Sequence, residues 1–133
     1  MSNVARAHRG LAFLFLAVGV IAFFLAGLGA FGEGFEPHQA SGSLLVLLSL
    51  VLLILAAIGR KEAVKQSAAL FGLMILQMVL AIAGEDVSVL GGLHPVNGLL
   101  ILFVAHQTAR ALPLPFVGGS GPGAPHARTG TAV

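Results

Sequence analysis

Residues 38–59, HQASGSLLVLLSLVLLILAAIG, form an apolar run that contains no charged residue. A helix needs roughly 20 mostly apolar residues to cross a bilayer, so this run predicts a membrane span. Three further stretches come close to the same length and character, at about 11–31, 67–84 and 93–112. The sequence therefore predicts an all-α integral membrane protein whose four spans pack as an up-down four-helix bundle.

The composition agrees with this class. Of the 133 residues, 57% are hydrophobic and 9% are charged, with neither tryptophan nor tyrosine, which lies outside the balance typical of a soluble domain. The absence of cysteine excludes disulfides, thiolate metal sites and covalent attachment of a c-type haem. No patterned basic face indicates nucleic acid as a partner, so the expected surroundings are a lipid bilayer. The chain also has no phosphate loop and no nucleophile–base pair, which favours an electron carrier or an accessory subunit over a catalyst.

Charges outside the spans predict the orientation. The first apolar run is longer than the roughly 7 to 15 residues of a signal-peptide core, so we expect it to be retained as a span. Lysine and arginine beside a span stay on the cytoplasmic side during insertion, and all of them fall on one side if both termini are inside: Arg6, Arg9, Arg60, Lys61, Lys65, Arg110 and Arg128. The two outer loops then carry only acids, namely Glu33, Glu36, Glu85 and Asp86. We therefore expect a protein of the cell membrane with cytoplasmic termini, the last 21 residues (113–133) forming a flexible Pro/Gly/Ala-rich tail.

Two halves of the chain echo each other. LAGLG at 25–29 matches LAIAG at 80–84, and each is followed by an acidic loop and a histidine. The echo continues as H-x-x-[SN]-G-x-L-[LI], in HQASGSLL at 38–45 and HPVNGLLI at 94–101, 56 residues apart. This pattern indicates a duplicated helical hairpin. A stripe of small residues in the first span permits close packing within the bundle or between copies, so a homo-oligomer is possible: Ala22, Ala26 and Ala30.

The two echoed histidines form the candidate site. Spans two and four run in the same direction and lie diagonally in an up-down bundle, so His38 and His94 should face each other at one depth. Each has a glycine four residues later on the same helix face, which leaves a flat slot beside the ring. These glycines are Gly42 and Gly98, and a small polar residue borders each slot, Ser41 or Asn97. Pro37 and Pro95 are expected to fix where the two helices begin.

Two axial imidazoles and a flat space between helices suit haem iron. The prediction is one haem b with His38 and His94 as metal ligands, and Ser41 and Asn97 as hydrogen-bonding groups around it. Such a protein would carry single electrons, with a quinone or a membrane oxidoreductase as partner. Zinc would need further ligands from the outer-loop acids, and a proton relay could use the same histidines.

The alternative is a membrane subunit without a cofactor, or an assembly partner of a larger complex, whose histidines only anchor helix ends. Gln77, near the middle of the third span, is expected to form an interhelical hydrogen bond rather than to carry chemistry.

The run Gln77-x-x-Leu80-Ala81, a glycine with an acidic loop, and Leu93-His94 at the fourth span resemble one four-helix half of the haem A synthase family. Size and the LHPVNG motif resemble still more closely the small bacterial four-span proteins of a family of unknown function. The resemblance covers about residues 10–112 and implies that His38 and His94 are axial haem ligands. The larger enzymes place a glutamate three residues before the first histidine and an arginine directly after it, where this chain has Phe35 and Gln39. That difference disfavours haem A synthesis itself.

Overall fold

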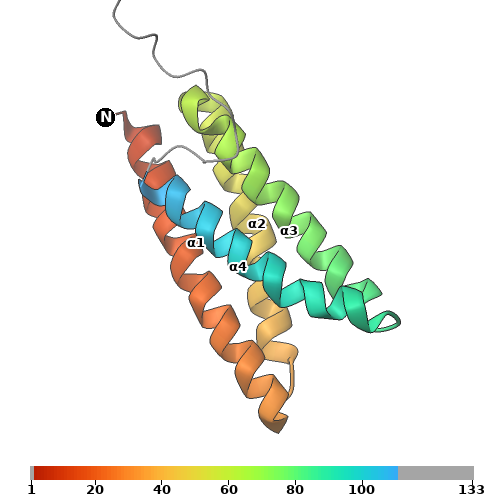
Figure 1. The fold of residues 1–133 in the computed structure, drawn as a ribbon. Coiled ribbons are helices and arrows are strands. Elements are labelled where there is room, and N and C mark those ends of the chain that lie inside the picture. Colours follow the sequence, from red (N-terminus) through yellow and green to blue (C-terminus); the bar gives the residue numbers. More distant parts are fainter. Residues whose placement is uncertain (1, 111–133) are drawn as a thin grey trace, which may run out of the picture.

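The structure, a computed structural model, describes residues 2–110, and these form four long helices joined by short turns (Figure 1). In chain order the helices are α1 Asn3–Leu28, α2 Glu36–Gly59, α3 Val64–Ala83 and α4 Ser88–Arg110. All four are long and apolar enough to cross a membrane, and residues 2–110 contain no strand. The all-α, four-helix prediction is therefore confirmed, whereas the tail predicted at 113–133 lies outside the described residues.

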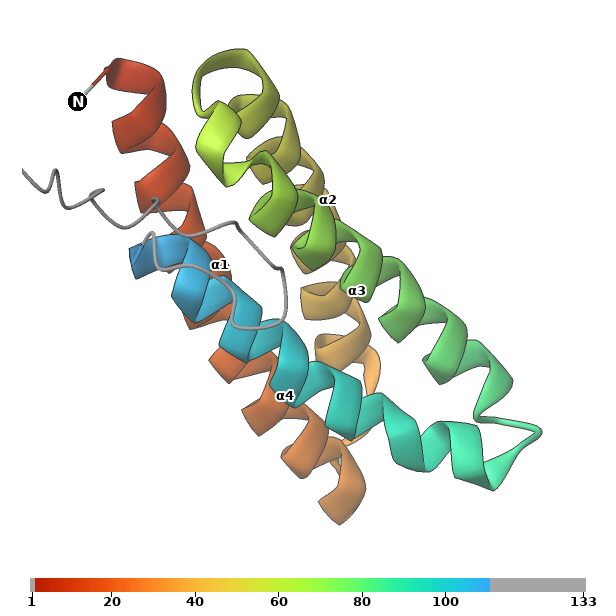
Figure 2. The same cartoon turned by 45° about the horizontal axis from the view of Figure 1, so that its top comes forward.

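Each helix packs against the next one in the chain, and α4 closes the bundle by packing against α1. Helices α2 and α4 consequently lie on a diagonal, as the sequence predicts. The turns at 29–35 and 84–87 lie at one end of the bundle, which we call the loop end; Asn3 and the turn at 60–63 lie at the other, the amino end. Figures 1 and 2 both show α3 diverging from α2 toward the loop end, while α4 crosses obliquely toward α1.

Local sequence explains where α1 and α2 begin and end. The hydroxyl of Ser2 accepts a hydrogen bond from the Ala5 amide (3.2 Å) and so caps α1. After α1 the chain makes one π-helical turn, Gly29–Glu33, and reverses through Gly32 (φ 104°) and Gly34 (φ 83°). Residues with a side chain rarely adopt these backbone angles, which is why glycine occupies both positions. Pro37 then falls in the first turn of α2, as predicted.

The predicted start of the fourth helix is wrong. Helix α4 begins at Ser88, so His94 and Pro95 lie inside it rather than at its beginning. A proline inside a helix removes one backbone hydrogen bond and crowds the carbonyl four residues earlier, here that of Gly91. Gly91 carries no side chain and packs closely on the backbone of Gly84, which holds this first part of α4 against the end of α3 despite the proline.

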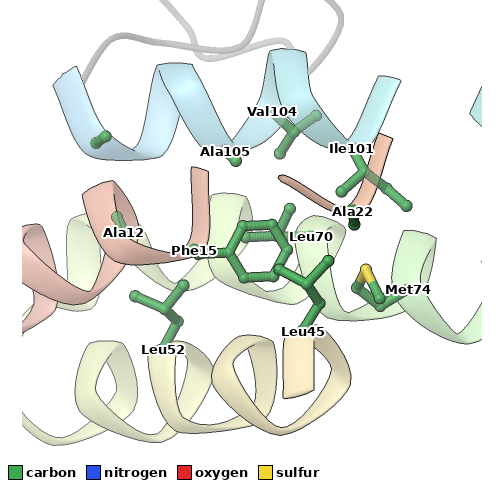
Figure 3. Packing of buried hydrophobic residues seen from close by; sticks show 11 residues of the cluster. Ala12, Phe15, Ala22, Leu45, Leu52, Leu70, Met74, Ile101, Val104 and Ala105 are labelled. Atoms are coloured by element: carbon green, nitrogen blue, oxygen red, sulfur yellow. The ribbon is translucent and has the colours of Figure 1, made fainter. Parts of the chain in front are cut away.

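The core lies on the bundle axis and takes one large side chain from each helix. Phe15, Leu52, Leu70 and Val104 are fully buried, and Figure 3 shows the Phe15 ring surrounded by leucines and by Val104. The outer surface is also apolar, because large side chains of all four helices point outward, among them Phe24, Ile58, Ile82 and Leu99. A surface of this kind is compatible with lipid rather than water as the surrounding solvent.

Replacing Phe15 by Ala is expected to destabilise the bundle by about 2 kcal/mol when unfolding is followed in detergent micelles. In a micelle the lost transfer from water contributes little, because the surroundings are as apolar as the core, so the cost comes mainly from the cavity. Thermal unfolding followed by circular dichroism measures the change. Phe24→Ala is the matched control on the same helix: its ring is 65% exposed, and its loss should leave the midpoint nearly unchanged. Equal destabilisation by both variants would contradict the packing described above.

Candidate functional site

A cavity of about 450 Å³ lies between the four helices in the half of the bundle toward the loop end. This volume falls in the range of roughly 300 to 1,000 Å³ that is usual for small-molecule sites. Its buried lining residues come from all four helices: Gly19 and Ala22 on α1, Leu45 on α2, Met74 on α3, and Gly98 and Ile101 on α4. Most of its exposed lining residues belong to α2, α3 and the turn after α3, namely Gln39, Ser43, Met78, Ala81, Ile82 and Glu85, and Phe23 of α1 is exposed as well. The cavity therefore opens sideways between α2 and α3, where Figures 1 and 2 show these helices diverging.

Both predicted histidines line this cavity. The ring centroids of His38 and His94 are 6.1 Å apart, and the ring planes meet at 71°. Each side chain is half-buried. The structure thus brings together two residues that are 56 positions apart in the sequence, at one depth and across the diagonal of the bundle.

The two rings are held in the same way. The Nδ1–H of His38 donates to the backbone carbonyl of Ala22 on α1 (2.8 Å), and the Nδ1–H of His94 donates to the backbone carbonyl of Gln77 on α3 (3.2 Å). A carbonyl oxygen only accepts, so Nδ1 carries the proton in both neutral rings and Nε2 is left as the electron-pair donor. Metal-binding histidines are commonly oriented by this kind of bond from the other ring nitrogen.

The Nε2 atom of His94 has a partner. The side-chain amide of Gln77 donates to it (3.1 Å), while the Gln77 side-chain oxygen accepts from Nδ2 of Asn97 (2.7 Å). Asn97 also donates to the backbone carbonyl of Leu73 (3.0 Å). The interhelical hydrogen bonding expected at Gln77 is therefore present, and it joins α3 to α4 at the cavity wall.

The other predicted site residues divide into two groups. Gly42 and Gly98 line the cavity, but a Cβ atom at Gly42 would meet nothing within 4 Å, whereas one at Gly98 would lie 2.8 Å from the Phe23 ring. The space beside Gly42 is thus open, and Phe23 fills the corresponding space beside Gly98. Ser41 donates to the backbone carbonyl of His38 within α2 (2.7 Å), and Asn97 bonds to α3, so neither hydroxyl nor amide is directed into the cavity by these bonds.

The outer-loop acids do not complete a metal site with the histidines. Within residues 2–110, no three histidine, aspartate or glutamate side chains gather in a group that could hold a metal ion. Of the four acids, Glu85 is the one at the cavity rim. Of the described histidines and acids, the cavity lining thus offers two imidazoles and the carboxylate of Glu85.

A second polar cluster lies at the amino end. The fully buried His8 ring is hydrogen-bonded through Nε2 to the Ser67 hydroxyl (3.0 Å), and its Nδ1 lies 3.5 Å from the Arg60 guanidinium. Arg60 in turn is paired with Glu62 (2.9 Å) and is itself buried. These contacts tie α1 to α3 and to the turn before it. The charge pattern of the sequence predicts only an orienting role for Arg60, and no motif in the sequence points to His8.

Comparison with known proteins adds one finding. Residues 22–84 match a family of unknown function (DUF6220). No curated protein and no solved structure matches the chain. The DUF6220 match begins at Ala22 and includes His38 and Gln77, but it ends before His94. It agrees with the expected likeness to an uncharacterised family, while the resemblance to half of a haem A synthase stays a prediction.

Proposed function

We propose that the protein is a four-span protein of the cell membrane that binds one haem b between α2 and α4, with His38 and His94 as axial ligands. Its termini lie on the cytoplasmic side, and the histidine pair lies near the outer face. The placement of the charges supports this orientation, because Arg6, Arg9 and Lys61 lie at the amino end, whereas Glu33 and Glu85 lie at the loop end.

The observation that carries the proposal is the geometry of the two rings. An imidazole nitrogen binds a first-row metal ion at about 2 Å, so two rings that share one ion have centroids about 6 Å apart. The separation of 6.1 Å between His38 and His94 fits this value. Both rings also have their protons on Nδ1, which leaves Nε2 for iron, and both line a cavity that is large enough for a ligand.

Haem held by two axial imidazoles supplies one-electron transfer and leaves no open iron position for oxygen or substrate. The residues of the chain would then do three things. His38 and His94 would hold the iron, the carbonyls of Ala22 and Gln77 would orient the rings, and the apolar cavity wall would keep water away. Since the cavity opens sideways between α2 and α3, a lipid-soluble electron partner such as a quinone, or a membrane oxidoreductase, can approach from the bilayer.

A second function is favoured by a different observation. Gln77, His94 and Asn97 already satisfy one another, so α3 and α4 are held together at the cavity wall without a ligand. A membrane subunit or assembly partner without a cofactor would need only this packing. The acidic residues and the apolar surface of the loop end would then contact another protein.

One experiment separates the two functions. The protein is expressed in a haem-replete host, extracted from the membrane fraction with a mild detergent, purified, and its visible spectrum recorded before and after reduction with dithionite. The haem proposal predicts a Soret band together with sharp α and β bands in the reduced sample. A colourless protein that also takes up no haem when haemin is added would overturn the haem proposal and favour the subunit.

A further inference from the structure

The two histidines occupy equivalent places in the two hairpins. His38 donates to a carbonyl 16 residues earlier and His94 to one 17 residues earlier, so Ala22 and Gln77 correspond to each other. The LAGLG and LAIAG segments align with the same offset of 55 positions. The sequence repeat is therefore accompanied by a repeated hydrogen bond. Each hairpin can consequently be compared, position by position, with the other.

The halves differ in the side chain at this position. Ala22 has only a methyl group, and within residues 2–110 the structure gives Nε2 of His38 no hydrogen-bond partner. Gln77 instead reaches back with its amide and donates to Nε2 of His94 (3.1 Å). In the described chain, Nε2 of His38 thus has no hydrogen-bond partner, whereas Nε2 of His94 is bonded to the Gln77 amide.

We propose that Gln77 is a positioning residue that covers Nε2 of His94 until a ligand arrives and then swings aside, so that the ligand is taken first by His38 and second by His94. This inference rests on the proposed function, because it concerns the order in which the same two histidines accept iron.

The surroundings of Gln77 allow this movement. Its side chain lines the cavity, so the amide has space to enter. When it leaves, Asn97 keeps its bond to the carbonyl of Leu73, and His94 keeps its bond to the backbone carbonyl of Gln77, which does not depend on the side chain. Only two hydrogen bonds are exchanged, and neither His94 nor Asn97 is left without a protein partner. Interhelical hydrogen bonds are weak in apolar surroundings, so we expect their loss to change ligand capture by about tenfold.

The test uses a probe that needs no haem. Diethyl pyrocarbonate carbethoxylates unprotonated imidazole nitrogens, and mass spectrometry gives the rate for each histidine in the same molecule. In the wild-type protein we expect His38 to react about ten times faster than His94. In Gln77→Ala, which gives the second hairpin the residue of the first, the rate at His94 should rise until the two are similar. The ratio within one molecule is insensitive to a general loosening of the bundle, which would raise both rates together.

Two further variants complete the design. Ala22→Gln places the amide beside His38 and should slow labelling there. Gln39→Ala removes a glutamine that lines the same cavity without a bond to either ring in the described chain, and it should leave the ratio unchanged. A wild-type ratio near one, or a ratio that Gln77→Ala does not move, would overturn the proposal.

Haem uptake is then measured separately by adding haemin to the same proteins and following the Soret band. Uptake by Gln77→Ala about ten times faster than by wild type is the expected result. Equal rates would overturn the role of Gln77 in a protein that does bind haem. If neither protein binds haem while the labelling ratio changes as expected, the haem assignment fails, and the cover of Nε2 by Gln77 still holds.

Discussion

His38→Ala and His94→Ala are each expected to abolish the spectrum of six-coordinate haem and to weaken haem binding more than about 100-fold. Changes in groups that only orient a ligand commonly cost 10- to 100-fold, so the loss of a ligand itself should exceed that range. Neither variant should unfold the protein. Each ring contributes one or two hydrogen bonds between helices, worth about 0.6 kcal/mol each in apolar surroundings, and both side chains are only half-buried.

The measurement is a haemin titration of the purified variants in detergent, with the reduced spectrum as the readout. His106→Ala is the matched control, because His106 lies on α4 about 18 Å along the helix from His94 and does not line the cavity. It should bind haem as the wild type does. Full retention of the low-spin spectrum in either His38→Ala or His94→Ala would contradict the assignment of these residues as ligands.

The four-helix fold could be predicted because the features that determine it, the length of each apolar run and the shortness of each turn, are local in the sequence. Each apolar run has the length of a span, and short turns force neighbouring helices to be antiparallel, which puts α2 and α4 on the diagonal. The boundaries were less predictable. Pro95 is typical of a first helical turn, yet α4 begins at Ser88, and the backbones of Gly84 and Gly91 lie close together just there.

The approach of His38 to His94 could also be predicted. The same motif occurs in two helices that run in the same direction, so it places both histidines at the same depth. What lies around the pair could not. Phe23 fills the space beside Gly98, and Gln77 covers His94; both come from other helices, and their positions depend on how α1 and α3 are rotated. No local pattern in the sequence records that rotation.

The burial of His8 could have been predicted from the helical period of the first span. Continuing the helical period of the first span backwards places His8 on the same face as the buried residues Ala12, Phe15, Gly19 and Ala22. A basic flank alone would leave it in solvent. In the structure it lies between Ser67 and Arg60, so Arg60 both belongs to the basic flank of the spans and takes part in packing them.

Gly84→Val is expected to destabilise the bundle by more than about 3 kcal/mol and to remove haem binding with it. A Cβ atom at Gly84 would lie 2.6 Å from Cα and 2.8 Å from N of Gly91. These atoms belong to the backbone of α4, so no rotation of a side chain relieves the contact. The α3–α4 hairpin would have to open, which moves His94 away from the carbonyl of Gln77 and from His38.

The adjacent helix offers the control. A Cβ atom at Gly92 would meet nothing within 4 Å, so Gly92→Ala should leave the midpoint of thermal unfolding unchanged or raise it slightly, because alanine favours the helix by about 1 kcal/mol over glycine. Gly84→Ala should fall between the two, since it introduces the contact without the branched side chain. If Gly84→Ala were as stable as Gly92→Ala, the approach of the two backbones would not be what holds α4 in place. The position of His94 in the cavity would then depend on its hydrogen bonds to Gln77 alone. Gln77→Ala would leave only the bond to the backbone carbonyl, and the ring would be displaced rather than uncovered.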